Sequence, residues 1–576
     1  MINQFKASRQ TVMRVFKLLN KPQKKDFIIQ IVYSLLLAGF EIISVAAVIP
    51  LLFKLSNDDN YQNNKIPETI LSLDYTLLFT FVIIAFITKN IISLIIIREQ
   101  SNYVSRIGLS LSKSLFSRFY QQSWINQLQE NSAESIRKLN TSAYDFSNHV
   151  LFGLLRFISE SIILLLVVIF ILFIDYRIIA LIILFSIPML WVYYLFRSKV
   201  VTKVEKAFKY LTPKSSVILS QALASLAETL IYKKQNYFIE NFLELKRATG
   251  QQLANLKTAS QVPGLLLELI AMGSFLLAYS FSHTSSVNGF SVTLVGLLTL
   301  AFYKIMPLLN RVFISMMNIH AYGYTMLELE NSFNKSGKVL GTAKPDFHFE
   351  RHLSLEVNSF QYNHARHNLT LENLHLTIQR GEFVVIEGPS GSGKTTLLHI
   401  LCGLIHDFNG ELSVDDEVLT PLNLNGWHNL IAYVPQSPVL IQDTLERNIA
   451  FGQEPFNLKD ANEAMRKVNL ENFLLNLPQG YQTLIGEGGS NISGGQRQRL
   501  ALVRALYRKP KVLFLDEVTS HLDIENKLTI LHSLKDINQL GITIVLATHE
   551  TTAQEYATQI IRIKEGKIEQ TLRQKA

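Results

Sequence analysis

The chain contains the stretch Gly388-Pro389-Ser390-Gly391-Ser392-Gly393-Lys394-Thr395, between an apolar segment at 383–386 and a second one at 395–401. A glycine-rich turn between a strand and a helix presents backbone N–H groups that can surround a triphosphate. Lys394 is then placed to bind the outer phosphates, and Thr395 to bind Mg²⁺. The stretch, together with Thr396, therefore predicts an ATP or GTP site.

Two further motifs narrow the class of nucleotide-binding protein. A phosphate loop alone leaves kinases, GTPases and motor proteins open. The stretch Ser493-Gly494-Gly495-Gln496 comes before Leu515-Asp516-Glu517, and this combination resembles the ATP-binding cassette (ABC) family. The resemblance implies ATP and Mg²⁺ as cofactors. It also implies an α/β P-loop ATPase domain, which we expect over residues 345–576 after a linker at 331–344.

The residues before the linker are unusually apolar. The chain has 576 residues, of which 48% are hydrophobic, and its mean hydropathy is positive. About 20 apolar residues are needed to cross the hydrocarbon core of a membrane. Buried helices of soluble proteins are shorter and usually apolar along one stripe only. We therefore predict an α-helical transmembrane domain over 1–330 with six spans, at 27–53, 75–97, 150–174, 178–196, 263–281 and 291–310.

The basic residues indicate the orientation in the membrane. Lys and Arg are concentrated before the first span, after the second and after the fourth, whereas the alternate loops contain few of them. Cytoplasmic loops carry this excess. We expect the N-terminus and the ATPase domain in the cytoplasm of a multi-pass protein of the bacterial inner membrane. The net charge of +9 then reflects topology, and no nucleic acid partner is predicted.

The spacing of the spans is uneven. About 50 residues separate the second and third spans and roughly 65 the fourth and fifth, and these stretches are rich in helix formers. Spans that continue as long cytoplasmic helices resemble the exporter class of ABC proteins, in which short coupling helices contact the nucleotide domains. By this resemblance, coupling helices are expected near 121–126 and 208–216.

Carboxylates end one apolar strand of the ATPase region. One carboxylate at a strand end can hold Mg²⁺, and its neighbour can polarise the water that attacks the γ-phosphate. The resemblance assigns Asp516 to the metal and Glu517 to the general base. It assigns Gln436 to Mg²⁺ and water sensing, His549 to the γ-phosphate, and Tyr362 to stacking on adenine. A strand-face tyrosine and a surface glutamine are the alternatives for Tyr362 and Gln436.

The stretch from Ser493 to Gln496 is predicted to open a helix whose N–H groups can meet a phosphate. In the ABC family this phosphate is held by the other nucleotide domain. One chain carries one phosphate loop and one such stretch, so a homodimer is the simplest assembly, with a heterodimer left open. Two residues depart from the family pattern: Ile492 replaces a leucine, and His521 replaces an alanine at the expected dimer interface.

Ionisable residues within the spans suggest where a substrate binds. Lys89, Lys304 and Arg311 are candidates for an anionic head group, because charges in hydrocarbon should face a cavity or a partner. Snorkelling to the interface is the alternative for these residues. Arg156 and Glu160 are expected to pair along one helix. The residues at 301–307 and 41–50 resemble bacterial lipid-linked oligosaccharide flippases.

The predicted function is ATP-driven export or flipping of an amphipathic substrate by a homodimer in contact with membrane lipids. A peptide or drug exporter is the main alternative within the class. An ATP-gated channel or receptor is the alternative from another class, since it would share the spans and motifs. An importer is disfavoured, because its membrane and ATPase parts are usually separate chains.

Overall fold

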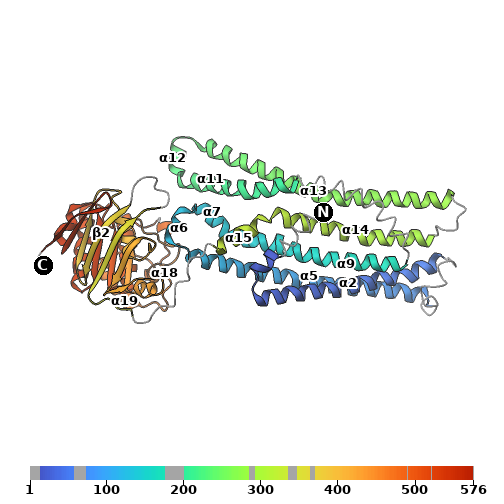
Figure 1. The fold of residues 1–576 in the computed structure, drawn as a ribbon, viewed down its shortest axis with the longest axis horizontal. Helices are drawn as coiled ribbons and strands as arrows, with labels where there is room; N and C mark the ends of the chain where they lie inside the picture. The colour runs from blue at the N-terminus through green and yellow to red at the C-terminus, as the bar shows by residue number, and fades with distance from the viewer. Residues whose placement is uncertain are drawn as a thin grey trace. The chain divides into compact units, whose positions relative to one another are not determined.

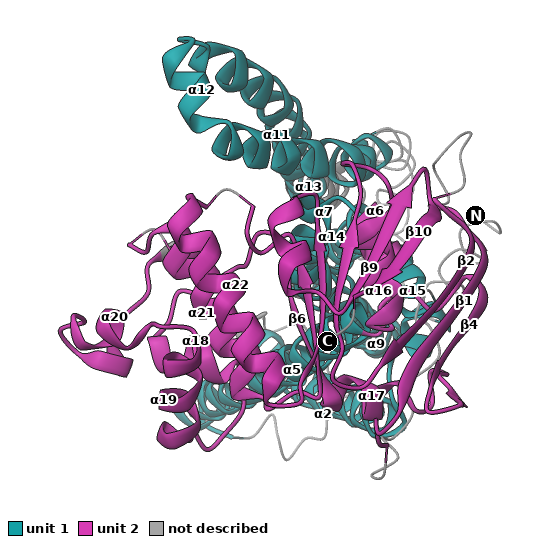
Figure 2. Ribbon diagram, turned by 90° about the vertical axis from the view of Figure 1, so that its left-hand side faces the viewer, with its two compact units in different colours: residues 1–120, 130–336 teal, residues 121–129, 337–576 magenta. Residues whose placement is uncertain are grey.

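The computed structural model describes residues 13–56, 73–174, 200–284, 292–334, 347–362, 370–489, 491–520 and 522–574. The chain divides into two compact units. Unit 1 comprises residues 1–120 and 130–336, and unit 2 comprises residues 121–129 and 337–576 (Figure 2). The short segment 121–129 therefore belongs to the same unit as the C-terminal part of the chain.

The regular secondary structure of unit 1 is helical in all of its described residues, with short turns between the helices (Figure 1). Its helices are α2 (Lys21–Ser56), α5 (Tyr75–Tyr120), α7 (Ser132–Arg137), α8 (Ala143–Asp145), α9 (Phe152–Ile174), α11 (Thr212–Ala224), α12 (Leu226–Ile231), α13 (Gln235–Thr284), α14 (Val292–Ala321) and α15 (Tyr324–Asn334). Three π-helical turns interrupt them, at Lys138–Ser142, Phe146–Leu151 and Ala207–Leu211. Long apolar runs form these helices, and their buried faces pack α2, α9 and α14 together.

Four helical stretches among the described residues are long and apolar enough to cross a membrane: Lys21–Lys54, Tyr75–Tyr120, Ser132–Ile174 and Gly296–Ala321. The first three contain the first, second and third predicted spans, and the fourth overlaps the sixth predicted span from residue 296 to residue 310. The fifth predicted span lies within α13. The fourth, at 178–196, lies outside the described residues, so the total of six stays a prediction.

The first half of α5 presents apolar side chains outward. Leu77, Phe81, Ile84, Leu94 and Ile95 are all more than half exposed. A soluble protein rarely exposes so large a continuous apolar surface, whereas a helix that faces lipid must do so. The chain is therefore a multi-pass membrane protein.

The helices that were expected to extend into the cytoplasm differ from expectation at one point. Residues 208–216 were expected to form a short coupling helix. Instead, they run through a π-helical turn into α11, and Ser215 is buried. The chain reverses direction later, at α12 (Leu226–Ile231), and α13 then packs beside α11 (Figure 1). Helix propensity is high throughout this region, so local sequence alone does not distinguish the long helix from the short one that follows it.

Unit 2 contains two β-sheets. The four-stranded sheet has the order β2-β1-β4-β5 and is antiparallel. The six-stranded sheet has the order β10-β9-β3-β8-β7-β6, and β9, β3, β8, β7 and β6 are parallel. The strands are β1 (His352–Phe360), β2 (Leu371–Gln379), β3 (Phe383–Glu387), β4 (Asn409–Val414), β5 (Glu417–Val418), β6 (Ile431–Val434), β7 (Val512–Asp516), β8 (Thr543–Thr548), β9 (Gln559–Lys564) and β10 (Lys567–Arg573).

Strands β3, β7 and β8 are buried along their whole length, which their continuous apolar runs explain. The α-helices of unit 2 are α6 (Trp124–Gln129), α16 (Lys394–Leu401), α17 (Leu424–Leu430), α18 (Leu445–Ala450), α19 (Leu458–Lys467), α20 (Glu471–Leu475), α21 (Gly494–Tyr507) and α22 (Ile524–Gln539). Because β3, β7 and β8 are parallel neighbours, the residues that follow them meet at one edge of the sheet.

Candidate functional site

The phosphate loop joins the end of β3 to the start of α16. Gly391 and Gly393 have φ angles of 81° and 105°, the left-handed region that favours glycine. A Cβ on Gly388 would lie 2.3 Å from the Ile563 carbonyl oxygen, so only glycine fits there. Ser392 Oγ is buried and has no hydrogen-bond partner among the described residues. A tight, polar loop of this kind fits a phosphate group.

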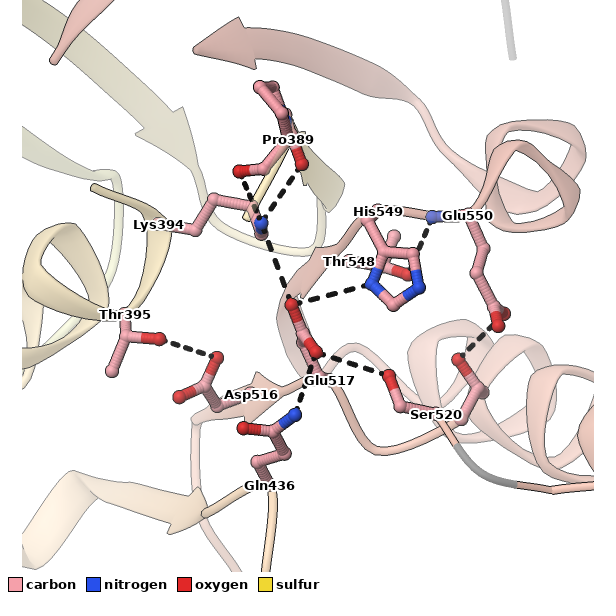
Figure 3. A network of polar contacts seen from close by, with 12 residues as sticks. Pro389, Lys394, Thr395, Gln436, Asp516, Glu517, Ser520, Thr548, His549 and Glu550 are labelled. Atoms are coloured by element: carbon pink, nitrogen blue, oxygen red, sulfur yellow. Dashed lines mark hydrogen bonds and ion pairs between the residues drawn. The ribbon is translucent and has the colours of Figure 1, made fainter. Parts of the chain in front are cut away.

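Lys394 is the first residue of α16 and is 5% exposed. Its Nζ donates hydrogen bonds to the carbonyl oxygens of Gly388 (2.9 Å) and Pro389 (3.1 Å). The same atom lies 3.5 Å from Glu517 Oε1. Two carbonyl oxygens of the loop thus hold the Lys394 ammonium group close to the Glu517 carboxylate, which follows β7 (Figure 3).

Asp516 is the last residue of β7 and is 4% exposed. Its two carboxylate oxygens have different partners: Thr395 Oγ1 donates to Oδ1 over 3.2 Å, and the Tyr433 hydroxyl donates to Oδ2 over 3.5 Å. Burial raises the pKa of Asp516, although the hydrogen bond from Thr395 lowers it. A hydroxyl and a buried carboxylate are oxygen donors of the kind that Mg²⁺ prefers, so these residues fit the metal.

Glu517 lies at the centre of the polar network in Figure 3. Gln436 Nε2 donates to its Oε2 over 2.8 Å, and Ser520 Oγ donates to the same oxygen over 3.3 Å. His549 Nδ1 lies 3.4 Å from Oε1. The φ angle of Glu517 is 48°, which is unusual for a residue with a Cβ. Strain of this kind is typical of functional sites.

The structure thus brings together most residues that the sequence singled out in this region. The phosphate loop, Gln436, Asp516, Glu517 and His549 lie in one network, although they come from four separate segments (Figure 3). The elements responsible are the loop after β3, the end of β6, the end of β7 and the end of β8. Parallel pairing of these strands places their ends side by side.

Tyr362 lies beside the phosphate-loop helix. Its hydroxyl is 3.4 Å from Thr396 Oγ1, and its ring packs at 5.0 Å on Phe360, edge to face. The side chain is half-buried. This places an aromatic ring next to the helix that follows the loop, and its stacking on adenine stays a prediction.

The stretch Ser493 to Gln496 forms the start of α21, as predicted. Ser493 is the N-cap, and its side chain accepts a hydrogen bond from the Gln496 backbone N–H while Gln496 Oε1 accepts from the Ser493 N–H. This capping box explains the helix start. Within the described residues, no hydrogen bond or ion pair joins this stretch to the phosphate loop. Ile492 is buried, and His521 lies outside the described residues.

Sequence reasoning missed three residues near the network. Ser520 binds Glu517, Tyr433 binds Asp516, and His399 Nε2 lies 3.3 Å from the Tyr433 hydroxyl. Burial lowers the pKa of His399 and raises that of Tyr433. Tyr433 could have been found by assuming that the strand 431–434 pairs in parallel with the strand that ends at Asp516, because both strands then end at the same edge of the sheet. His399 had no such signal beyond its place on the phosphate-loop helix.

The candidate substrate residues of unit 1 are held in ion pairs. Lys89 and Lys304 share Glu41: Lys89 Nζ is 3.1 Å from Oε2, and Lys304 Nζ is 3.3 Å from Oε1. Lys304 is 6% exposed, and its Nζ lies 4.9 Å from the centre of the Phe86 ring. The two lysines together carry one positive charge more than the single Glu41 carboxylate can neutralise.

Arg311, and not Arg156, is the ion-pair partner of Glu160. Its Nε lies 3.0 Å from Glu160 Oε1, whereas the guanidinium of Arg156 lies over the Phe152 ring at 5.5 Å. The predicted pairing of Glu160 with Arg156 is corrected accordingly. The cause is tertiary, since α9 packs along α14 and brings Arg311 across to Glu160.

Comparison with known proteins agrees with this geometry. A family model described as "ABC transporter" matches residues 371–520. An ATP-dependent lipid A-core flippase of Burkholderia thailandensis is 29% identical over 64% of this chain and 61% of its own length. A colicin V secretion/processing ATP-binding protein of Escherichia coli is 36% identical over 37% of this chain and 30% of its own. ABC transporter B family member 13 of Arabidopsis thaliana is 36% identical over 37% of this chain and 17% of its own.

The matched part of the chain thus spans less than two thirds of each of these relatives. A bacterial Atm1-family ABC exporter, whose structure was solved with ATP bound, superposes with a TM-score of 0.76 over 94% of both chains, at 19% identity. That likeness shows the fold. The matched domain binds ATP in the family that it represents. The chain therefore contains an ABC transporter domain at residues 371–520, on the same polypeptide as helices long and apolar enough to span a membrane, and its fold is that of the Atm1-family exporter.

Proposed function

We propose that this protein hydrolyses ATP to export or flip an amphipathic substrate across the membrane. The observation that carries the proposal is the convergence of Gln436, Ser520, His549 and Lys394 on Glu517. A carboxylate held beside the phosphate-binding lysine and a histidine can accept a proton from a water molecule that attacks the γ-phosphate. The site is thus arranged for hydrolysis as well as for binding.

Mg²⁺ fits the edge of this site. The Thr395 hydroxyl, the Asp516 carboxylate and the Gln436 side-chain amide would hold it, directly or through water. When bound, Mg²⁺ neutralises charge on the β- and γ-phosphates. Within this chain, Lys394 binds the outer phosphates, Glu517 takes the proton, and His549 helps to hold the γ-phosphate.

The complete site requires a second copy of this chain. The N-terminus of α21 carries the exposed residues Ser493 and Gly494. The Ser493 N–H is used by the capping box, but the Gly494 N–H has no hydrogen-bond partner among the described residues and suits a phosphate. Within the described residues they have no hydrogen bond to their own phosphate loop. We infer that they complete the site of a partner chain, so that a homodimer holds two ATP molecules between its nucleotide domains.

The substrate is proposed to carry an anionic head group, as a lipid-linked oligosaccharide does. The Glu41 cluster supports this, because Lys89 and Lys304 bring two positive charges to one carboxylate. An excess charge among membrane helices is costly unless an ion of opposite sign binds there. The resemblance of the lipid A-core flippase agrees with a lipid substrate in the bacterial inner membrane.

Export of a peptide is the second candidate within the class. It is favoured by the similarity to the colicin V secretion/processing ATP-binding protein. That likeness covers 37% of the chain, so it supports the assignment of the ATP-binding domain more than it supports a peptide substrate.

Reconstitution tests the proposal and separates it from an ATP-gated channel or receptor. The purified full-length protein is placed in proteoliposomes that contain fluorescent phospholipid, lipid-linked oligosaccharide or peptide. A transporter moves one of these against its gradient in proportion to ATP hydrolysed, and its substrate stimulates hydrolysis. An ATP-gated channel passes its ligand only down the gradient, and the Glu517→Gln variant would still open it.

A further inference from the structure

A chain of contacts connects helix α6 with the carboxylate of Asp516. The Trp124 ring of α6 packs edge to face on the His399 ring of α16, with 5.5 Å between ring centres. His399 Nε2 lies 3.3 Å from the Tyr433 hydroxyl, and that hydroxyl reaches Asp516 Oδ2 over 3.5 Å. All four residues belong to unit 2 (Figure 2).

The direction of the hydrogen bonds follows from the number of protons. A carboxylate only accepts, and a tyrosine hydroxyl has a single proton to donate. If that proton points to Asp516, the hydroxyl must accept from His399, so Nε2 carries the ring proton. His399 Nδ1 is then an acceptor, and it has no partner among the described residues. The order of donation is therefore His399 to Tyr433 to Asp516.

Each oxygen of Asp516 is thereby held from a different side. Thr395, which belongs to the phosphate-loop helix, holds Oδ1. Tyr433 holds Oδ2, and it is in turn held by His399. Hydrogen-bond partners of this kind orient the carboxylates that ligate metals and tune their affinity.

Helix α6 occupies an unusual position in the chain. It lies between α5 and α7, both helices of unit 1, but it is part of unit 2. Trp124 and its neighbour Ile125 pack against the same apolar core as Leu397, Leu398 and Trp427. The Tyr433 to Asp516 contact is long for an O–H···O hydrogen bond, so a small displacement of His399 is enough to shorten or break it.

We propose that His399 and Tyr433 are positioning residues for Asp516, and that Trp124 of α6 sets their position. The metal-binding carboxylate thus responds to the segment of chain that connects the membrane helices. The inference deepens the proposed function, because it names how the membrane region regulates the ATP site. In this proposal, His399 and Tyr433 act only through Asp516 and have no contact with ATP and no part in proton transfer.

The first test measures the Mg²⁺ requirement of the purified full-length protein. Tyr433→Phe removes only the hydroxyl and preserves the ring, so the fold is not at risk. We expect the Mg²⁺ concentration that half-saturates ATP hydrolysis to rise about tenfold. Binding of a fluorescent ATP analogue in EDTA should not change, because the phosphate loop is intact.

Tyr481→Phe is the matched control. Its hydroxyl donates to Asn462 Oδ1 over 2.7 Å, on the surface of unit 2 and outside the site. The same Mg²⁺ requirement in both variants would overturn the role of Tyr433. His399→Leu should act like Tyr433→Phe, whereas His399→Gln, whose amide nitrogen can donate in place of Nε2, should restore most of the Mg²⁺ affinity. No restoration by glutamine would overturn the hydrogen-bond order.

The second test uses the fluorescence of Trp124, which does not depend on turnover. The chain has three tryptophans, so the emission of Trp124 is the difference between the parent protein and its Trp124→Phe variant. In a Glu517→Gln background with ATP present, adding Mg²⁺ should change this difference spectrum. The change should be lost with His399→Leu and kept with His399→Gln; a change that persists with leucine would contradict the connection.

A double-mutant cycle completes the test. Trp124→Ala and Tyr433→Phe should not be additive in their effect on the half-saturating Mg²⁺ concentration, because both act through His399. Additive effects would mean that Trp124 does not act on Asp516 by this route. If the parent protein neither binds nor hydrolyses ATP, the proposed function fails. If the parent protein does both, but the Trp124, His399 and Tyr433 variants need no more Mg²⁺ than Tyr481→Phe, the positioning role alone fails.

Discussion

Gln436 Nε2 donates a hydrogen bond of 2.8 Å to Glu517 Oε2. The two residues are 81 positions apart and follow neighbouring parallel strands, β6 and β7. The amide of Gln436 is exposed, whereas the Glu517 side chain is 15% exposed. A surface residue is therefore in direct contact with the carboxylate that we propose as general base.

Replacing Glu517 by Gln should abolish most hydrolysis while ATP binding persists. The amide preserves the size of the side chain but cannot accept the proton, and the loss of a general base typically costs about 10²-fold or more. Phosphate release measures turnover, and ATP retained through gel filtration measures binding. The variant should accumulate as an ATP-bound dimer.

Glu550→Gln is the control for this prediction. The Glu550 carboxylate binds Thr519 and Lys527, next to the site but away from Lys394 and Gln436. We expect it to keep most of the activity. A Glu517→Gln variant that turns over as fast as Glu550→Gln would contradict the assignment of the base.

Replacing Lys394 by Ala should weaken ATP binding itself. The ammonium is the only charged group of the loop sequence 388–395, and a charged hydrogen bond is worth enough to lower affinity by roughly 10- to 100-fold. Titration with a fluorescent ATP analogue measures the effect. Lys509→Ala, which breaks an exposed pair with Asp460, should bind like the parent protein; equal affinity of the two variants would argue against the phosphate-loop role.

Neutralising Lys304 and Arg311 should impair transport before it impairs ATP hydrolysis. If the substrate has a phosphate or pyrophosphate, Lys304→Met with Arg311→Gln removes two cations from the membrane helices. Substrate-stimulated hydrolysis and transport should fall several-fold, and basal hydrolysis should largely persist because the changes lie in unit 1.

Lys138→Met serves as the matched control for these substitutions. Lys138 pairs with Glu134 over 3.0 Å within one helical stretch, apart from the Glu41 cluster. Transport that is unchanged in the double variant would remove Lys304 and Arg311 from the substrate path. Mass spectrometry of lipids that copurify with the parent protein would then show which class of molecule binds.

Mixed dimers test whether Ser493 serves the partner's site. A dimer of one Lys394→Ala chain and one Ser493→Arg chain concentrates both defects in one site and leaves the other intact. Each mutant homodimer has two damaged sites. Partial recovery of hydrolysis on mixing is therefore expected.

The control is a dimer of one parent chain and one doubly substituted chain. In the arrangement that we propose, each of its two sites carries one defect, so it should be less active than the mixed dimer. If Ser493 instead served its own chain's site, this order would reverse, since the parent chain would then hold an intact site. Separate affinity tags on the two chains allow the purified dimers to be compared directly.

The sequence by itself determined the local parts of the nucleotide site. The apolar run at 383–386, the glycines of the loop and the helix that follows form a strand, a turn and a helix through contacts between near neighbours. The same is true of the strand that ends at Asp516, and of the capping box that places Ser493 at the start of α21. Propensity, steric freedom at glycine and capping are local effects, so the sequence reveals them.

Only the tertiary structure decided which side chains meet. Glu41 receives Lys89 and Lys304 from two other helices, and Glu160 pairs with Arg311 of α14 instead of Arg156 on its own helix. The contact from Trp124 to His399 spans 275 positions, the difference of the two residue numbers. Such pairs depend on the packing of whole helices and strands, and the free energy of burying those faces is set by partners that local sequence does not contain.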